Sequence, residues 1–354
     1  MIDALPVSNV TNEQPAGIGR VAALRDGCAW NNLGRNVVFA DDRLGPTAIF
    51  GDTIYPDDPV TSEFDLDVHA IVDLGDAGAT AVLNHLGLLR IFTPARRDAR
   101  GAVGPDLHED RRLGFVADIE RVASAGALLV TSRPRGDRLP GLLVTEPIGT
   151  ARDPVGAVDA QESFGVVTAV AAGQTGTRSG WVALGGEGRV RLVERDGDRL
   201  AATRWETAVP FLPAVVVGGT RSIWVAGSAL GGTDLDDYDW DRLVGGGLAH
   251  LDLASGAVLA SGRFGADLAW GSGGVPFVVV DGVPCGIDRR GGLHVLVPGD
   301  PVTSAITPPL AERSLGIAHA AVVDRRVVFG FNRGGYRLFA VPADRVTAAG
   351  ARRA

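Results

Sequence analysis

Two histidines and two aspartates have side chains that could hold a divalent metal ion. His69 and His319 stand in similar contexts, Val-His-Ala and Ala-His-Ala, within short apolar segments. Asp118 and Asp267 are carboxylates beside comparable segments. Imidazoles with a carboxylate could bind Ca²⁺ or Zn²⁺ and activate water for hydrolysis. The alternative is that each histidine bonds backbone groups and has only a structural role. We favour that alternative and expect no cofactor.

A second group of candidates is an acidic segment that also carries two aromatic residues. It contains Asp234, Asp236, Asp237, Tyr238, Asp239, Trp240 and Asp241. Alternating aspartates are typical of the start of a calcium loop, but Arg242 stands where that loop needs glycine and Leu248 where it needs glutamate. Two interpretations remain open. The segment is a solvated acidic loop, or it binds a basic partner through Tyr238 and Trp240.

The sequence lacks the motifs of several enzyme classes. It contains no P-loop, no Gly-x-Ser-x-Gly elbow and no His-Glu-x-x-His. Cys28 and Cys285 are far apart and are expected to be core residues. These absences favour a binding protein over an enzyme.

Charge and hydropathy exclude several partners. The net charge is −8 and the pI is about 5.3, so nucleic acid is not an expected partner. No apolar run is long enough to span a membrane, and the N-terminal residues have no signal-peptide pattern. We therefore expect a cytoplasmic protein with no membrane contact. Its oligomeric state is left open.

Short strands and recurring turns indicate a repeat. Apolar runs rich in β-branched residues are bounded by Gly, Asp, Asn or Pro, which predicts many short strands. A four-residue turn recurs after the second strand of each predicted unit. Its copies begin at Asp42, Asn84, Arg133, Gly185, Asp288 and Asn332, and a seventh is expected near Asp236. Positive φ is expected at Gly87, Gly291 and Gly335.

This pattern resembles β-propellers in general, over nearly the whole chain. The architecture is WD40-like, but no Trp-Asp or Gly-His dipeptides and no kelch-type glycine pairs mark the units. The resemblance implies an all-β fold: a single seven-bladed β-propeller of four-stranded antiparallel blades. We expect an N-terminal extension over 1–18, the propeller over 19–345 and a C-terminal tail over 346–354. The N-terminal run Gly19–Leu24 is predicted to complete the blade containing Asn332 and so close the ring.

The fold predicts where a ligand would bind. First strands line the central channel of a propeller, which brings Trp30 and Trp270 into consideration as binding residues beside the acidic segment. The first hypothesis is a non-catalytic scaffold that recognises a protein or small ligand on its channel-mouth face. The alternative is a metal-dependent hydrolase or lyase, lactonase-like, with its site at the channel. We prefer the first.

Overall fold

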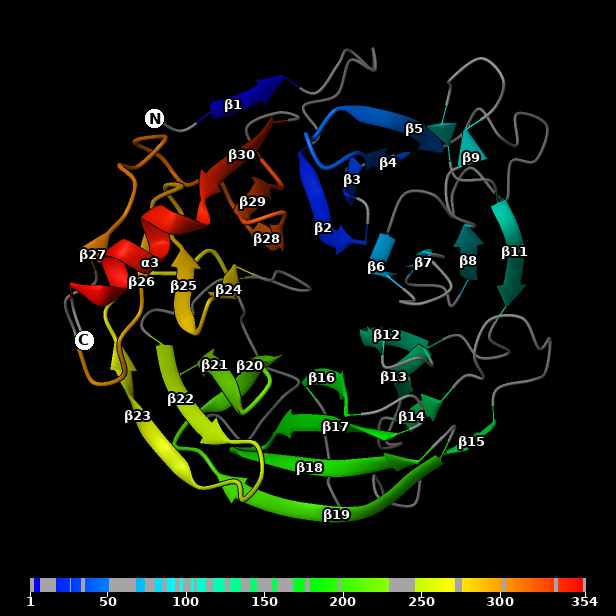
Figure 1. Cartoon of the computed structure of the whole chain (residues 1–354), viewed down its shortest axis with the longest axis vertical. Coiled ribbons are helices and arrows are strands. Elements are labelled where there is room, and N and C mark those ends of the chain that lie inside the picture. The colour runs from blue at the N-terminus through cyan, green and yellow to red at the C-terminus, as the bar shows by residue number, and fades with distance from the viewer. Residues whose placement is uncertain are drawn as a thin grey trace.

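The described part of the chain is built from antiparallel sheets arranged around a common centre (Figure 1). The computed structural model describes residues 3–6, 17–25, 27–32, 36–50, 68–73, 80–84, 88–92, 96–97, 103–104, 107–112, 117–124, 128–134, 141–144, 155–157, 168–175, 179–196, 199–228, 246–270, 276–300, 304–333 and 337–352. Within these ranges there are seven four-stranded sheets and one two-stranded sheet.

Three of the four-stranded sheets come from the N-terminal part of the chain. The first contains β2 (Ile18–Leu24), β3 (Gly27–Asn32), β4 (Asn36–Ala40) and β5 (Pro46–Phe50). The second contains β6 (Val68–Asp73), β7 (Thr80–Asn84), β8 (Leu88–Phe92) and β11 (Leu107–Arg112). The third contains β12 (Ala117–Ser124), β13 (Leu128–Pro134), β14 (Gly141–Val144) and β15 (Val155–Ala157). The two-stranded sheet joins β9 (Arg96–Arg97) to β10 (Val103–Gly104).

The other four sheets follow in chain order. The fourth contains β16 (Ala169–Gln174), β17 (Ser179–Gly186), β18 (Arg189–Asp196) and β19 (Arg199–Ala208). The fifth contains β20 (Leu212–Gly218), β21 (Ser222–Ser228), β22 (Gly246–Asp252) and β23 (Val258–Phe264). The sixth contains β24 (Phe277–Val280), β25 (Val283–Ile287), β26 (Leu293–Val295) and β27 (Ser304–Ala305). The seventh joins β28 (Ala318–Val323), β29 (Arg326–Phe331) and β30 (Arg337–Pro342) to β1 (Asp3–Pro6).

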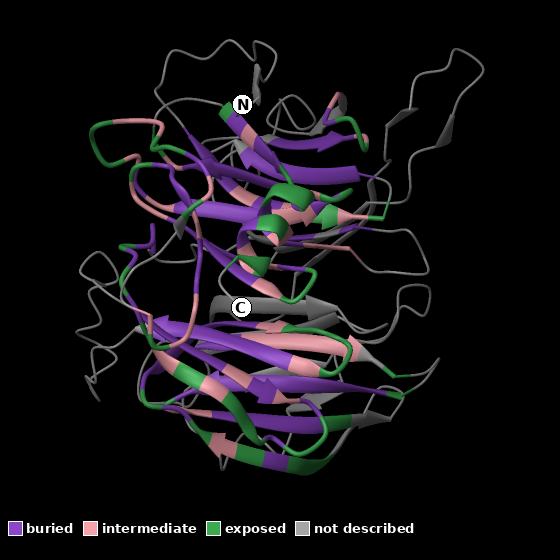
Figure 2. Ribbon diagram, turned by 60° about the vertical axis from the view of Figure 1, so that its left-hand side comes forward, coloured by how far each residue is buried: buried purple, intermediate pink, exposed green. Residues whose placement is uncertain are grey.

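The first strands of neighbouring sheets contact one another. They follow the order β2, β6, β12, β16, β20, β24 and β28, and β28 also contacts β2. Apolar clusters fill the space between sheets; one joins Ile18 and Trp30 of the first sheet to Val328 and Leu338 of the seventh. Figure 2 shows buried residues concentrated along the strands and exposed ones at turns and on the outermost strands.

The strand pairing corrects the predicted closure. Gly19–Leu24 lies in β2, which pairs with β3 and begins the first sheet. The strand that pairs with β30 is β1, in the register Asp3↔Ala340 to Pro6↔Arg337. The prediction that Gly19–Leu24 completes the blade containing Asn332 is therefore wrong. An N-terminal strand occupies that place, but it comes from the expected extension over 1–18.

The C-terminal residues form a helix. The helix α3 (Ala343–Ala351) follows Pro342, the N-cap residue, whose backbone is extended with φ of −58° and ψ of 138°. Its buried side chains are Ala343, Val346 and Ala349, which recur at helical spacing and face the cluster of the sixth and seventh sheets. The expected tail over 346–354 thus includes packed residues. No helix among the described residues is long and apolar enough to cross a membrane.

The turns connecting second and third strands lie where six of the seven were predicted. The connections near Asn84, Arg133, Gly185, Asp236, Asp288 and Asn332 each join the second strand of a sheet to the third. The turn at Asp42 was wrongly assigned, because it joins β4 to β5, the third and fourth strands. The second-to-third connection of the first sheet spans 33–35 instead.

Asparagine side chains at two second-strand ends hold the incoming first strands. The Oδ1 of Asn31 accepts from the backbone N–H of Arg20 at 2.5 Å, and the Oδ1 of Asn332 accepts from that of Ile317 at 2.8 Å. In each case glycine precedes the donor, Gly19 or Gly316. A Cβ on either glycine would collide with the asparagine side chain. The first and seventh sheets thus share the same arrangement of an asparagine side chain and a glycine.

Candidate functional site

Three of the four residues predicted to hold a metal lie on first strands, and the fourth lies between two sheets. His69 is on β6, where the pairing with β7 shifts register between Val68 and Ala70. Asp118 is on β12, and His319 is on β28, 7% exposed. Asp267 lies between β23 and β24.

The described side chains do not assemble a metal centre. β6 and β12 belong to neighbouring sheets, but the side chains of His69 and Asp118 lie outside the described residues. Asp267 Oδ1 lies 3.6 Å from Arg289 Nε, so its nearest ion-pair partner is a cation. Among the side chains that are described, no three or more His, Cys, Asp or Glu are placed to share a metal ion. The metal site stays a prediction.

Both tryptophans predicted to bind a ligand are core residues. Trp30 is 1% exposed and lies on β3, a second strand, opposite Val21 and Val38. Trp270 is also 1% exposed and packs with Phe264 and Phe277. Neither side chain reaches the surface, so the prediction that Trp30 and Trp270 form part of the binding face is corrected. Each ring stabilises its sheet by burying apolar area.

The acidic segment interrupts a hairpin whose two strands pair to their ends. Asp234 to Asp241 lie outside the described residues, within 229–245, which we call the acidic insertion. The last pair before it joins Ser228 to Gly246. In the preceding sheet, Gly186 pairs with Arg189 and only Glu187 and Gly188 intervene, both at positive φ. The insertion therefore occupies the end of the β21–β22 hairpin, and the equivalent hairpin of the preceding sheet is closed by a two-residue turn.

Glycines at the base of the insertion admit two aromatic rings. A Cβ on Gly246 would meet the ring of Phe264, and one on Gly247 would meet the ring of Phe211. Both rings are buried. The glycines at this strand boundary therefore serve close packing at the start of the strand that follows the insertion.

A polar cluster surrounds the β25–β26 turn at the same end of the neighbouring sheet. Asp288 Oδ1 accepts from the backbone N–H groups of Arg290 and Gly292, each at 2.8 Å. The other oxygen, Oδ2, lies 2.7 Å from His294 Nε2. Arg289 completes the cluster, donating from Nη2 to the carbonyl of Trp270 at 3.4 Å and facing Asp267. Gly291 has φ of +86°, as predicted, while Gly87 and Gly335 lie outside the described residues.

The two carboxylates of this cluster have opposite pKa shifts. Burial alone would raise the pKa of Asp288, but the hydrogen bonds from His294 and the turn amides outweigh it and lower that pKa. Burial raises the pKa of Asp267, the charge of Asp288 adds to this, and Arg289 opposes it. Asp288 is therefore ionised at neutral pH with both oxygens engaged. This cluster shapes the turn, and Asp288 has no oxygen left over to act as a base.

The cysteines are poor nucleophiles. Burial raises the pKa of Cys28 and of Cys285 to about 12 in each case. The thiolate is the reactive form, so neither side chain is activated at neutral pH. Both are free and buried, in agreement with the expectation that they are core residues.

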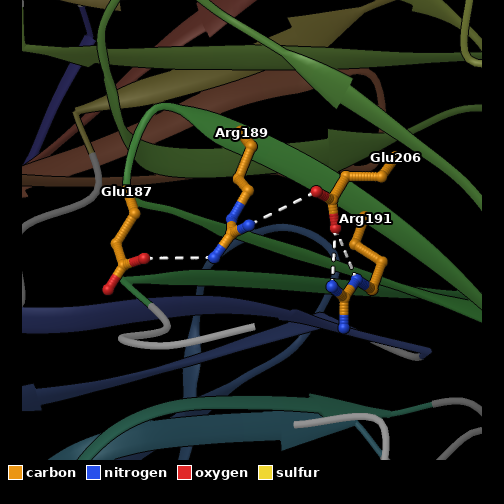
Figure 3. A network of polar contacts seen from close by, with 4 residues as sticks. All are labelled: Glu187, Arg189, Arg191 and Glu206. Atoms are coloured by element: carbon orange, nitrogen blue, oxygen red, sulfur yellow. Dashed lines mark hydrogen bonds and ion pairs between the residues drawn. The ribbon is translucent and has the colours of Figure 1, made fainter. Parts of the chain in front are cut away.

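A network of four charged side chains ties together the outer strands of the fourth sheet (Figure 3). Arg191, on β18, lies opposite Glu206 on β19 and bonds its Oε2 through Nε and Nη2, both at 2.7 Å. Arg189 bridges Glu206 Oε1 at 3.4 Å and Glu187 Oε2 at 3.1 Å. Glu206 therefore accepts from both arginines, and the network joins the β17–β18 turn to the outermost strand.

Comparisons with known proteins identify the fold and no family. No protein-family model matches the chain, and no curated protein matches its sequence. The structure of the Dos1 propeller is similar with a TM-score of 0.53 and 10% identity, over 92% of this chain and 78% of that one. BamB from Moraxella catarrhalis is similar with a TM-score of 0.54 and 10% identity, over 96% and 97%. Similarity at this identity concerns architecture alone. The chain therefore has an all-β, propeller-like fold of antiparallel sheets.

Proposed function

We propose that this chain is a closed seven-bladed propeller that acts as a non-catalytic binding module. Its recognition face is the end of the sheets that carries the second-to-third-strand connections. The acidic insertion is the chief recognition element, and a protein with a basic surface is the partner that its charge favours.

Contacts between the first and seventh sheets support the closed ring. β1 pairs with β30, and β28 contacts β2. The guanidinium of Arg326, at the start of β29, donates to the carbonyl of Asp42 in the β4–β5 turn. Gly17 lies so close to the end of β29 that a Cβ would meet its backbone. A ring joined in this way has no exposed sheet edge between its last and first blades.

One observation carries the functional proposal: a long acidic and aromatic segment replaces a turn in an otherwise tight hairpin. Segments longer than about 12–15 residues without secondary structure are uncommon in compact domains and are often functional. Antiparallel strands alternate in direction, which places second-to-third connections and the segments entering first strands at the same end. The insertion consequently shares its face with the Asp288 turn.

The composition of the insertion suits a protein interface. Tyr238 and Trp240 supply large apolar surfaces that cost little conformational entropy to order. The carboxylates that flank them in the sequence supply the negative charge that speeds encounter with a basic partner at low ionic strength.

The test is a deletion of Asp234–Asp241, with the ends joined by a short glycine-containing turn. The probe is a fluorescein-labelled peptide of alternating Arg and Gly with one central Trp, followed by fluorescence anisotropy. We expect the variant to keep its circular dichroism and thermal midpoint, because neighbouring hairpins need only tight turns. Its affinity for the peptide should fall roughly tenfold, since several exposed charge pairs are lost together.

The control variant removes two acidic charges from the opposite face. Asp281 and Asp324 lie in first-to-second-strand turns at positive φ of 47° and 39°. Asparagine tolerates that conformation, so Asp281→Asn with Asp324→Asn changes charge without straining the turns. This control should bind the peptide as the unmodified protein does. Equal binding by the deletion variant and the unmodified protein would refute the proposal.

A further inference from the structure

Three exposed arginines from two neighbouring sheets lie together on the proposed recognition face. Arg290 belongs to the β25–β26 turn, Arg313 to the segment between β27 and β28, and Arg333 to the residues that follow β29. We call these three residues the arginine rim. They belong to the sixth and seventh sheets, next to the sheet that carries the acidic insertion.

Backbone hydrogen bonds fix the rim. The N–H of Leu310 donates to the carbonyl of Arg290 at 2.8 Å, and the N–H of Leu315 donates to that of Arg289 at 2.8 Å. The N–H of Arg333 in turn donates to the carbonyl of Leu315 at 3.2 Å. The segment carrying Arg313 is thereby held between the two turns, so the backbone positions of the three arginines are fixed relative to one another.

Two carboxylates near the rim are already engaged, and a third, that of Glu312, is exposed next to Arg313 in the chain. Asp288 is bonded to His294 and two turn amides, and Asp267 faces Arg289. Arg290 donates from Nη2 to the backbone carbonyl of Glu312 at 3.3 Å. Among the described residues, no carboxylate forms an ion pair with Arg290, Arg313 or Arg333. This is notable in a chain with a net charge of −8, where carboxylates outnumber guanidinium groups.

We propose that the arginine rim binds an acidic peptide segment of a protein partner. Guanidinium groups present paired N–H donors that match carboxylates, and several on one support can engage successive Glu or Asp side chains. The rest of the acidic surface repels such a segment, so the rim is where it docks. The proposal does not depend on the function proposed for the acidic insertion.

The experiment measures binding of a fluorescein-labelled peptide of alternating Glu and Gly by anisotropy at low salt. The triple variant Arg290→Gln, Arg313→Gln, Arg333→Gln should bind roughly tenfold more weakly, and added salt should remove binding by the unmodified protein. The matched control is Arg221→Gln, Arg263→Gln, Arg345→Gln. It removes the same charge from exposed residues elsewhere in the described structure and should lower the affinity far less.

The outcomes distinguish this proposal from the previous one. Deletion of Asp234–Asp241 should weaken the Arg-Gly peptide and leave the Glu-Gly peptide bound. Equal losses in the rim variant and its control would mean that only net charge matters, and the rim proposal would be rejected. Absence of Glu-Gly binding by the unmodified protein at low salt would also reject it. A thermal midpoint recorded for each variant identifies any loss caused by unfolding.

Discussion

Removal of the Asp288 side chain should lower the free energy of unfolding more than removal of most other turn side chains. Its carboxylate accepts two backbone N–H groups and contacts His294, and only 20% of the side chain is exposed. A turn of the same geometry forms at Asp41, whose Oδ1 accepts from Arg43 at 3.0 Å and Gly45 at 2.8 Å. Asp41 has no histidine partner among the described residues, so the two turns form a natural comparison.

The expected costs follow from the bonds lost. Asp41→Ala removes two hydrogen bonds from backbone N–H groups to a side-chain oxygen, like those of a helix N-cap. It should lower the free energy of unfolding by about 1–2 kcal/mol. Asp288→Ala removes the equivalent bonds and also the contact with His294, leaving a buried imidazole nitrogen without a partner. It should cost about 3–4 kcal/mol. The difference measures the histidine contact, and Asp288→Asn, which keeps the Oδ1 acceptor, should cost less than Asp288→Ala.

The assay is urea unfolding followed by tryptophan fluorescence, with amide hydrogen exchange at Arg290 and Gly292 as the local measure. Because the folded-state pKa of Asp288 is lowered, its contribution is complete above the ordinary aspartate pKa and is lost as the pH falls through the folded value. The gap between Asp288→Ala and the unmodified protein should therefore shrink below about pH 4. Equal costs for Asp41→Ala and Asp288→Ala would refute the assigned role of His294.

Two further substitutions test the packing between elements, and a third serves as a comparison. Gly316 has φ of +86° and faces Asn332, so Gly316→Ala should cost about 2–3 kcal/mol in urea unfolding. Gly282→Ala, at φ of +83° with open space around it, should cost only about 1 kcal/mol, and similar costs would show that the asparagine contact is unimportant. Trp205→Phe keeps an apolar ring but removes the bond from Nε1 to the carbonyl of Leu253, 3.0 Å, and should lower the unfolding free energy by about 1 kcal/mol.

Strand positions were largely predictable because their signals are local. Apolar runs rich in β-branched residues between turn formers indicated many short strands, and a recurring turn placed most second-to-third connections. The positive φ of Gly291 also followed from residue type, because glycine is the residue that adopts it without strain. These features depend on a few neighbouring residues, and the sequence alone contains that information.

Local similarity also caused the main error in strand assignment. The turns at Asp41 and Asp288 share one hydrogen-bonding pattern, with a left-handed residue at the fourth position, Leu44 or Gly291. One turn joins third and fourth strands and the other joins second and third. A turn type specifies how the chain reverses, not which pair of strands it connects. The better signal for the first sheet was Asn31-Asn-Leu-Gly34, which resembles Asn84-His-Leu-Gly87.

Contacts between distant segments could not be derived from such local patterns. The strand beside β30 is β1, where the sequence had predicted Gly19–Leu24. Which segment pairs with an open sheet edge depends on which one reaches that edge in the folded chain. Trp30 and Trp270 are buried because neighbouring sheets cover them, and a tryptophan near a predicted channel has the same sequence signature whether it is covered or exposed. Asp267 and Asp288 acquire opposite pKa shifts from partners fixed only by the fold. The acidic insertion and the arginine rim show the same contrast between local patterns and distant contacts. The insertion can be recognised in the sequence as a run of residues. The rim cannot, because it forms only where backbone hydrogen bonds join two sheets.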